Sequence, residues 1–233
     1  MLVVLVRDRV VVERPARFLG VRRLPKAAER AHRRGEYTPR VPDLVLDAAR
    51  SRVRIHTFAE GLLARLAHDL ELSCGELEGT ASGDKDATAG TASILVPLRG
   101  MAVAGVLGKD GRVDDRGLSP TERRDCIAKM YSDVFHSRAG GVVRVEVKLA
   151  GGEARLRIVP PSESEVVVVI RPDLRPEAGG VRATGSFDVS LKAIGSGPVK
   201  GPMGAFRVKD RVMISFDVLF VVAPPAPPSA QPA

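Results

Sequence analysis

Apolar and polar residues alternate along much of the chain, and a clear short example lies just after residue 50. Val53 and Ile55 fall on one face of an extended chain, whereas Arg52, Arg54 and His56 fall on the other. Successive side chains of a β-strand point to opposite faces of a sheet. This period of two therefore predicts a strand with one face in a core and one face in solvent.

The same pattern recurs in later parts of the chain. It predicts further strands at residues 70–74, 142–149, 153–159, 165–170, 181–192 and 211–222. Residues 91–107 predict two short strands bent around Pro97 to Gly100, and the Gly151-Gly152 pair predicts a hairpin turn. Most of the chain between residues 44 and 222 is therefore expected to be antiparallel sheet.

One segment, at about residues 119–135, has the pattern of a helix instead. Ser119 is followed by Pro120 and Glu122, which gives the spacing of a capping box and a proline at the first helical position. Four apolar residues recur at helical intervals and are expected to pack as one stripe: Ile127, Met130, Tyr131 and Val134.

The segment FAEGLLARLAH, residues 58–68, joins the first two of these strands. It is too short for a domain and too apolar for a solvated loop. We interpret it as a helical turn or lid held against the end of the core, with Leu62, Leu63 and Leu66 as the covering residues.

These elements predict an all-β protein, a closed antiparallel β-barrel of about eight strands with one inserted α-helix at about residues 119–135. Closure is favoured over a sandwich because a closed barrel removes exposed sheet edges. An eight-stranded barrel is either filled by its own side chains or holds one slender ligand. The chain has no Trp, two Tyr and seven Phe. Bulky side chains that could fill the interior are therefore scarce, and a cavity is favoured.

Charge separates the chain into a body and two tails. The net charge is +8, but residues 1–42 alone hold 11 basic and 4 acidic residues, so the remainder is nearly neutral. We predict a basic extension at 1–43, a barrel domain at 44–222 and a Pro-rich tail at 223–233. The extension is either a solvated arm or a contact for anionic surfaces, and no specific nucleic-acid partner is expected for the body.

Cysteine content and hydropathy add little about location. Cys74 and Cys126 are too few for a disulfide framework. The apolar start is interrupted at Arg7, and no apolar run is long enough for a membrane span, so no transmembrane segment is expected. A cytoplasmic location is predicted, or a periplasmic one if the true start of the chain differs.

The candidate catalytic groups do not form a recognisable constellation. The spacing of the histidines does not suggest a zinc site, and His68 beside Asp69 is not a triad, because neighbours on a strand point oppositely. His68 is more simply a hydrogen-bonded structural residue. The loop at 195–204 fails the phosphate-binding patterns because Lys200 precedes Gly201, so it is expected to shape a long hairpin connection.

Three stretches together resemble the YceI-like family of polyisoprenoid-binding proteins. They are LDAARSRVRIHTFAEGLLARLAHDLEL, KMYSDVF and GSFDVSLKAIGSGPVKGPMGAFRVKDRVMISFDVLF, which occur in this order between residues 46 and 220. The resemblance implies a lipocalin-like barrel whose interior holds a long isoprenoid chain, with no catalytic activity and no cofactor.

We therefore expect non-catalytic binding, for sequestration or transport, of a long apolar lipid such as a polyisoprenoid. The alternative is a dry barrel that acts as a stress-related or protein-interaction scaffold. The lipid is the expected partner, and a homodimer is a further option. His68 and Lys200 are candidates for a polar headgroup. The candidate ligand-binding residues are Val53, Ile55, Phe58, Leu62, Leu63, Leu66, Leu70, Leu72, Val143, Val145, Phe187, Val189, Val212, Ile214 and Phe216.

Overall fold

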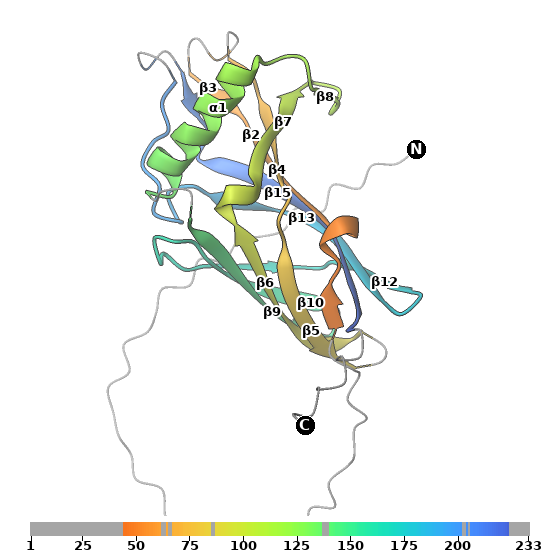
Figure 1. Cartoon of the computed structure of the whole chain (residues 1–233). Helices are drawn as coiled ribbons and strands as arrows, with labels where there is room; N and C mark the ends of the chain where they lie inside the picture. The colour runs from red at the N-terminus through yellow and green to blue at the C-terminus, as the bar shows by residue number, and fades with distance from the viewer. Residues whose placement is uncertain are drawn as a thin grey trace, which may run out of the picture.

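The computed structural model describes residues 44–61, 64, 67–84, 87–136, 140–201, 204 and 206–223. Most of these residues form one strongly curled antiparallel sheet, with a helix at one end (Figure 1). The strands are β1 Leu44–Leu46, β2 Arg52–Thr57, β3 Ala59–Glu60, β4 Leu70–Cys74, β5 Glu78–Gly83, β6 Ala89–Pro97, β7 Met101–Leu107, β8 Val113–Asp114, β9 Val142–Ala150, β10 Glu153–Val159, β11 Val166–Ile170, β12 Asp173–Glu177, β13 Gly180–Ser190, β14 Arg207–Val208 and β15 Arg211–Val222.

The helical elements are short. They are the 3₁₀ turns η1 Ala48–Arg50 and η3 Leu98–Gly100, the α-helix α1 Pro120–Lys129 and the π-helical turn η4 Met130–Val134. The η3 turn separates β6 from β7, which confirms the predicted bend at Pro97 to Gly100.

The main sheet is ordered β11-β10-β9-β6-β5-β1-β15-β2-β4-β7-β8, and β13 pairs along the whole second edge of β15. β12 pairs with β13 alone. The all-β prediction with one helix is therefore confirmed. The predicted closure is wrong, because β11 pairs only with β10 and no hydrogen-bonded ladder joins β11 to β13 or β12. β11 and β12 follow one another, but Pro172 between them has no N–H to continue a ladder.

The helix begins where the sequence predicts. The Ser119 hydroxyl accepts from the Glu122 N–H and the Glu122 carboxylate accepts from the Ser119 N–H, so both halves of the capping box form. The predicted stripe packs against the core. Arg123 fastens the helix to β7 by donating to the carbonyl oxygens of Val103 and Ala104 at 2.5 and 3.0 Å.

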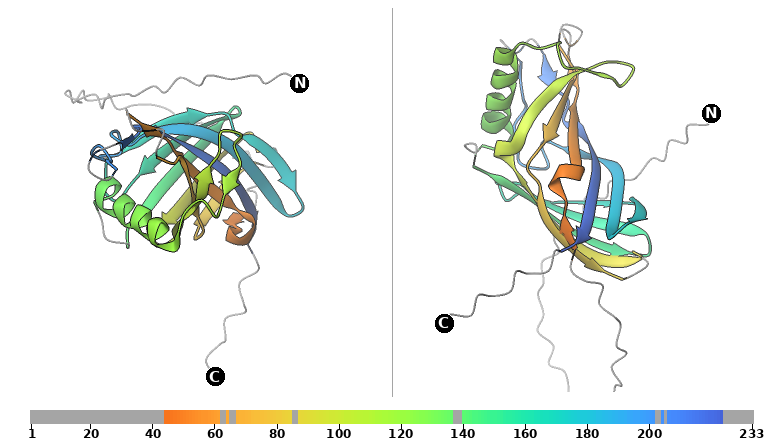
Figure 2. Two further views of the ribbon diagram at one scale, coloured as in Figure 1. Left: turned by 90° about the horizontal axis from the view of Figure 1, so that it is seen from above. Right: turned by 45° about the vertical axis from the view of Figure 1, so that its right-hand side comes forward.

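The segment predicted as a helical turn or lid is partly extended. Ala59–Glu60 forms β3, which pairs with β14, and the Asp69 carboxylate accepts from the Ala59 N–H at 2.8 Å. Both β3 and α1 lie at the same end of the sheet, opposite the β5 hairpin (Figures 1 and 2). Leu62, Leu63 and Leu66, as well as most of the two predicted tails, lie outside the described residues.

Candidate ligand-binding cavity

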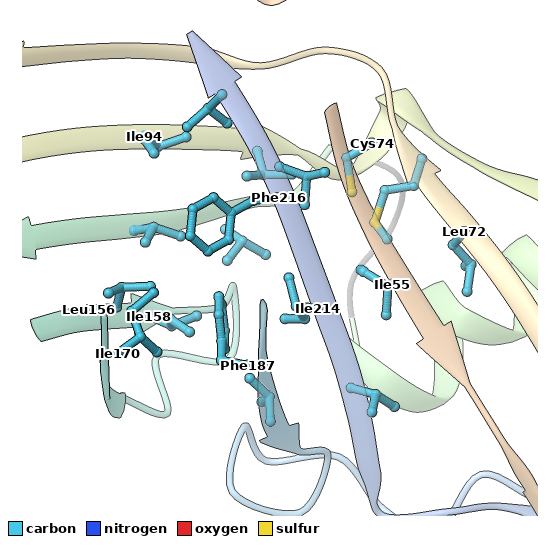
Figure 3. Close-up of a pocket in the computed structure, with 18 of the residues that line it drawn as sticks. Ile55, Leu72, Cys74, Ile94, Leu156, Ile158, Ile170, Phe187, Ile214 and Phe216 are labelled. Atoms are coloured by element: carbon cyan, nitrogen blue, oxygen red, sulfur yellow. The ribbon is translucent and has the colours of Figure 1, made fainter. Parts of the chain in front are cut away.

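The curled sheet encloses a cavity of about 1010 Å³. Its wall is built from the inward faces of strands β2, β4, β6, β9, β10, β13 and β15, with one side of α1 and η4 at the helix end. Aliphatic and aromatic side chains dominate this wall (Figure 3). Ile55, Val145 and Phe216 point inward and yet are only half-buried, because the space in front of them is not filled by other side chains.

Two phenylalanines on neighbouring strands contribute aromatic rings to the cavity wall. The ring centroids of Phe187 on β13 and Phe216 on β15 are 6.2 Å apart, with an interplanar angle of 52° (Figure 3). Gly185 faces Phe216 in the ladder, and a Cβ atom at Gly185 would lie 2.7 Å from the Phe216 ring. The absence of a side chain at Gly185 is therefore what allows the ring to lie across the strand.

Every predicted ligand-binding residue that the structure describes lines this cavity. The alternation in sequence is the reason, because it assigns one face of each strand to the interior and antiparallel pairing brings these faces together. The residues are Val53, Ile55, Phe58, Leu70, Leu72, Val143, Val145, Phe187, Val189, Val212, Ile214 and Phe216.

Other parts of the cavity wall lie outside the predicted set of residues. Ile94 on β6, Leu156 and Ile158 on β10 and Ile170 on β11 face the same space. Apolar and polar residues alternate in β10 too, so the period of two that predicts the other wall residues applies to Leu156 and Ile158 as well. Met130 and Val134 of the helical stripe also line the cavity, and this was not evident from helical periodicity alone, which cannot distinguish a filled core from a cavity wall.

Charged groups collect at the helix end of the cavity. His68, Glu122, Asp125, Lys129 and Lys200 line this end, and all of these residues are exposed. The Lys129 ammonium lies 2.6 Å from the Asp133 carboxylate.

The carboxyl of Glu122 is held in its charged form. The Ser119 N–H and hydroxyl bond to it and lower its pKa below the usual range, with a smaller contribution from the charge of His68. His68 and Glu122 are thus neighbours at this mouth. The hydrogen bond predicted for His68 at the start of the strand is instead made by Asp69, and within the described residues His68 makes none.

Lys200 is held in the hairpin-like connection that its Gly and Pro neighbours predicted. Lys200 forms an isolated bridge with Arg207, and the Gly201 N–H donates to the Phe206 carbonyl at 2.8 Å. The Phe206 ring lies against the Cα atom of Gly201, where a Cβ atom would collide with it. This packing places Lys200 and Phe206 together at the helix end of the cavity.

Among the described residues, the opposite end, around the β5–β6 and β12–β13 hairpins, offers few charged groups to a ligand. Asp84 is a charged residue there, but its carboxylate accepts from the Thr88 N–H and hydroxyl and from the Ala89 N–H. Bonds to Thr88 chiefly hold its pKa below the usual value. The two ends of the cavity therefore differ in the charge available to a ligand.

Both cysteines line the cavity as thiols. Cys74 is 4% exposed, and burial raises its pKa to about 12. Cys126 on α1 is half-buried, and burial together with the nearby Asp125 and Glu122 carboxylates raises its pKa as well. Neither thiol is activated as a nucleophile, since thiolate is the reactive form.

Within the described parts of the chain, no cluster of three or more His, Cys, Asp or Glu side chains could hold a metal ion. No helix among these residues has the length and apolar character needed to cross a membrane.

Comparison with known proteins identifies the fold alone. No family model and no curated protein matches the sequence. Among solved structures, BcnA of Burkholderia cenocepacia is similar, with a TM-score of 0.52 and 13% sequence identity over 75% of this chain and 98% of BcnA. At this identity the similarity shows that the two chains share a barrel-like all-β fold.

Proposed function

We propose that the protein binds one long apolar lipid, without catalysis, inside the curled sheet. The observation that carries this proposal is the cavity of about 1010 Å³ with an almost entirely apolar wall. Pockets for drug-sized ligands span roughly 300–1,000 Å³, so this space suits a chain longer than a typical small molecule. The sequence resemblance to the YceI-like family supports a polyisoprenoid as the ligand.

Burial of the hydrocarbon is the expected source of affinity. Each CH₂ group removed from water contributes about 0.8 kcal/mol, so ten such groups supply about 8 kcal/mol, which corresponds to a dissociation constant of about 1 μM. His68 and Lys200, which line the helix end of the cavity, are the residues that we propose to contact a polar end of the lipid. The alternative, a dry scaffold, would need an interior filled by side chains, and the size of the cavity favours the lipid instead.

The test begins with the ligand that the protein acquires in cells. Purified protein is extracted with organic solvent and the extract is analysed by mass spectrometry, with an equal mass of an unrelated β-protein from the same host as control. A stoichiometric lipid enriched over the control is expected. A separate portion of the folded protein is freed of lipid on a hydrophobic resin and titrated with the fluorescent fatty acid cis-parinaric acid, and geranylgeraniol and stearic acid are compared as competitors.

The competitors separate the ligand classes. Stronger competition by geranylgeraniol indicates an isoprenoid chain, whereas stronger competition by stearic acid would replace it with a straight-chain lipid. No extracted lipid together with no binding of any of the three probes would reject lipid binding and support the scaffold.

A further inference from the structure

The wall of the cavity has a seam that is closed without backbone hydrogen bonds. On one side is β11, and on the other is residues 185–190 of β13. β12 pairs with β13 only as far as Thr184, and no backbone hydrogen bond joins β11 to β13 within the described residues. Few Cα atoms of the two strands lie within 8 Å of each other.

Side chains close this seam. Val168 and Ile170 of β11 and Val189 of β13 are each 4% exposed and belong to one apolar cluster with Phe187. The two ends of the seam are held differently. At the helix end the Ser162 hydroxyl donates to the Ile194 carbonyl at 2.8 Å, and at the other end the β12–β13 ladder begins at Asp173 and Thr184.

The other free edge of the sheet is protected in a way that the seam is not. The β7 side is covered by α1, and Arg123 bonds to backbone carbonyls there. Separating β11 from β13 would break apolar contacts and the Ser162 bond, but none of the ladder bonds, each of which contributes about 1 kcal/mol in an ordinary sheet. The seam is therefore the part of the wall that opens with the least loss of structure.

Opening the seam would lead directly into the cavity, because Ile170 and Phe187 (Figure 3), together with Val189, line both the seam and the cavity. The side chains that close the seam are apolar. By contrast, the helix end presents exposed Glu122, Asp125, Lys129 and Lys200. A hydrocarbon chain that passes these groups must desolvate charge, whereas a chain that passes between the two strands does not.

We propose that the seam between β11 and residues 185–190 of β13 is a lateral gate through which the apolar chain enters and leaves the cavity. This inference rests on the proposed lipid binding. The gate opens by separation of the two strands at the Ser162–Ile194 end, while the β12–β13 ladder acts as the hinge. The gate governs the rates of exchange, and the cavity governs the affinity.

A disulfide at the free end of the seam tests the gate. A Cβ atom at Gly195 would lie 3.6 Å from the Cβ atom of Ser162, which is within the range of disulfides. The variant is Ser162→Cys with Gly195→Cys, in a Cys126→Ala background so that this half-buried thiol does not compete. The matched control is Thr80→Cys with Ser93→Cys, an exposed cross-strand pair on β5 and β6, which are already joined by a ladder.

Rates are measured by stopped-flow fluorescence of cis-parinaric acid, with transfer to phosphatidylcholine vesicles for release. We expect the oxidised Ser162–Gly195 disulfide to slow uptake and release by about tenfold or more while the equilibrium affinity stays nearly constant. Dithiothreitol should restore both rates. The control pair should show no change on oxidation.

A second pair of variants keeps the test valid if cysteine is not tolerated at Gly195, whose φ is +87°. Val168→Ala removes packing at the seam, and Val103→Ala makes the same change on β7; the two valines are 4% and 6% exposed. Val168→Ala should accelerate uptake and release several-fold, and Val103→Ala should not.

The outcomes distinguish the two proposals. If the wild type binds cis-parinaric acid and the oxidised disulfide or Val168→Ala leaves the rates unchanged, the gate is rejected and lipid binding stands. If the wild type binds no cis-parinaric acid, geranylgeraniol or stearic acid, lipid binding is rejected and the gate with it.

Discussion

Gly185 and Phe216 are coupled through a single steric contact in the cavity. Because a Cβ atom at Gly185 would lie 2.7 Å from the ring, Gly185→Val should force the ring to move and should destabilise the protein by about 1–3 kcal/mol. In a Phe216→Leu background the same change should cost much less. The free energy of unfolding of the four proteins in this double-mutant cycle measures the coupling, and additive effects would show that the ring is not held by Gly185.

Cys74 gives the cavity wall a pH dependence. Its pKa rises from 9.0 in the unfolded chain to about 12 in the folded one, so the folded state retains a proton that the unfolded state loses above pH 9. The contribution of the Cys74 thiol to the free energy of unfolding is therefore fully present below pH 9. It falls as the pH rises toward 12. The loss should be about 1 kcal/mol at pH 10.

Denaturant unfolding at pH 8 and pH 10 measures this loss, with Cys74→Ala as the comparison. Other groups titrate in both proteins. The quantity to compare is therefore the change in the free energy of unfolding with pH in the wild type and in Cys74→Ala. The wild type should lose more stability than Cys74→Ala over this interval, and equal slopes would mean that the thiol is not protected by burial.

The side chains that face the cavity could be predicted from the sequence where apolar and polar residues alternate along a strand. Val53 and Ile55 were assigned to the interior because of their period of two, and the structure has them on the cavity wall. The partner of Asp69 could not be predicted, because the Ala59 N–H belongs to another strand of the fold. Which histidine or acid makes a given bond depends on register, and local sequence does not specify it.

At the scale of elements, α1 depends on its capping box. Ser119→Ala removes a hydroxyl that accepts from the Glu122 N–H and should cost about 1 kcal/mol, as is typical of an N-cap serine. Ser93→Ala, on the exposed face of β6, is the control and should be nearly neutral. Denaturant unfolding monitored by circular dichroism checks both.

The effect of Ser119→Ala should also depend on pH. The pKa of Glu122 is lowered by its bonds to Ser119, so this stabilisation is present above the usual glutamate pKa of 4.5 and is lost as pH falls. The difference between wild type and Ser119→Ala should therefore shrink in acid. A difference that stays constant down to low pH would show that the Ser119 hydroxyl does not bond to the carboxylate.

The extent of the helix and the bend between β6 and β7 were predictable because both have local causes. Ser119, Pro120 and Glu122 set the start of α1, and Pro97 and Gly100 set the bend. The short β3 strand was not predictable. Ala59–Glu60 is extended because it pairs with Arg207–Val208, and the Glu60 carboxylate lies 2.6 Å from the Arg207 guanidinium, far along the chain.

At the scale of the whole molecule, the open seam shows what a pattern of strands leaves undetermined. Alternation specifies which face of a strand is buried, but it does not specify the neighbour at each edge. The β10–β11 ladder ends at Ile170, shortly before Pro172. The next strand, β12, pairs with β13 instead of β10. The general cost of free edges favours closure, whereas in this chain apolar side chains of β11 and β13 pack together without a ladder between the strands.

A larger side chain in the cavity should raise the stability of the fold and weaken the binding of a ligand. Ala92 on β6 lines the cavity and is only half-buried, so Ala92→Phe should place its ring in existing space. Burial of the added ring should raise the stability of the ligand-free protein by about 1–2 kcal/mol. Ala102→Phe, the same change at an exposed position of β7, should have no such effect.

Thermal unfolding with and without geranylgeraniol completes this prediction. A ligand that binds only the folded state stabilises it by an amount that grows with its concentration relative to the dissociation constant. The wild type and Ala102→Phe should gain stability as geranylgeraniol is added, whereas Ala92→Phe should start higher and gain less, because its ring takes up part of the space that a lipid chain would occupy. An equal gain in all three proteins would place the ligand away from Ala92.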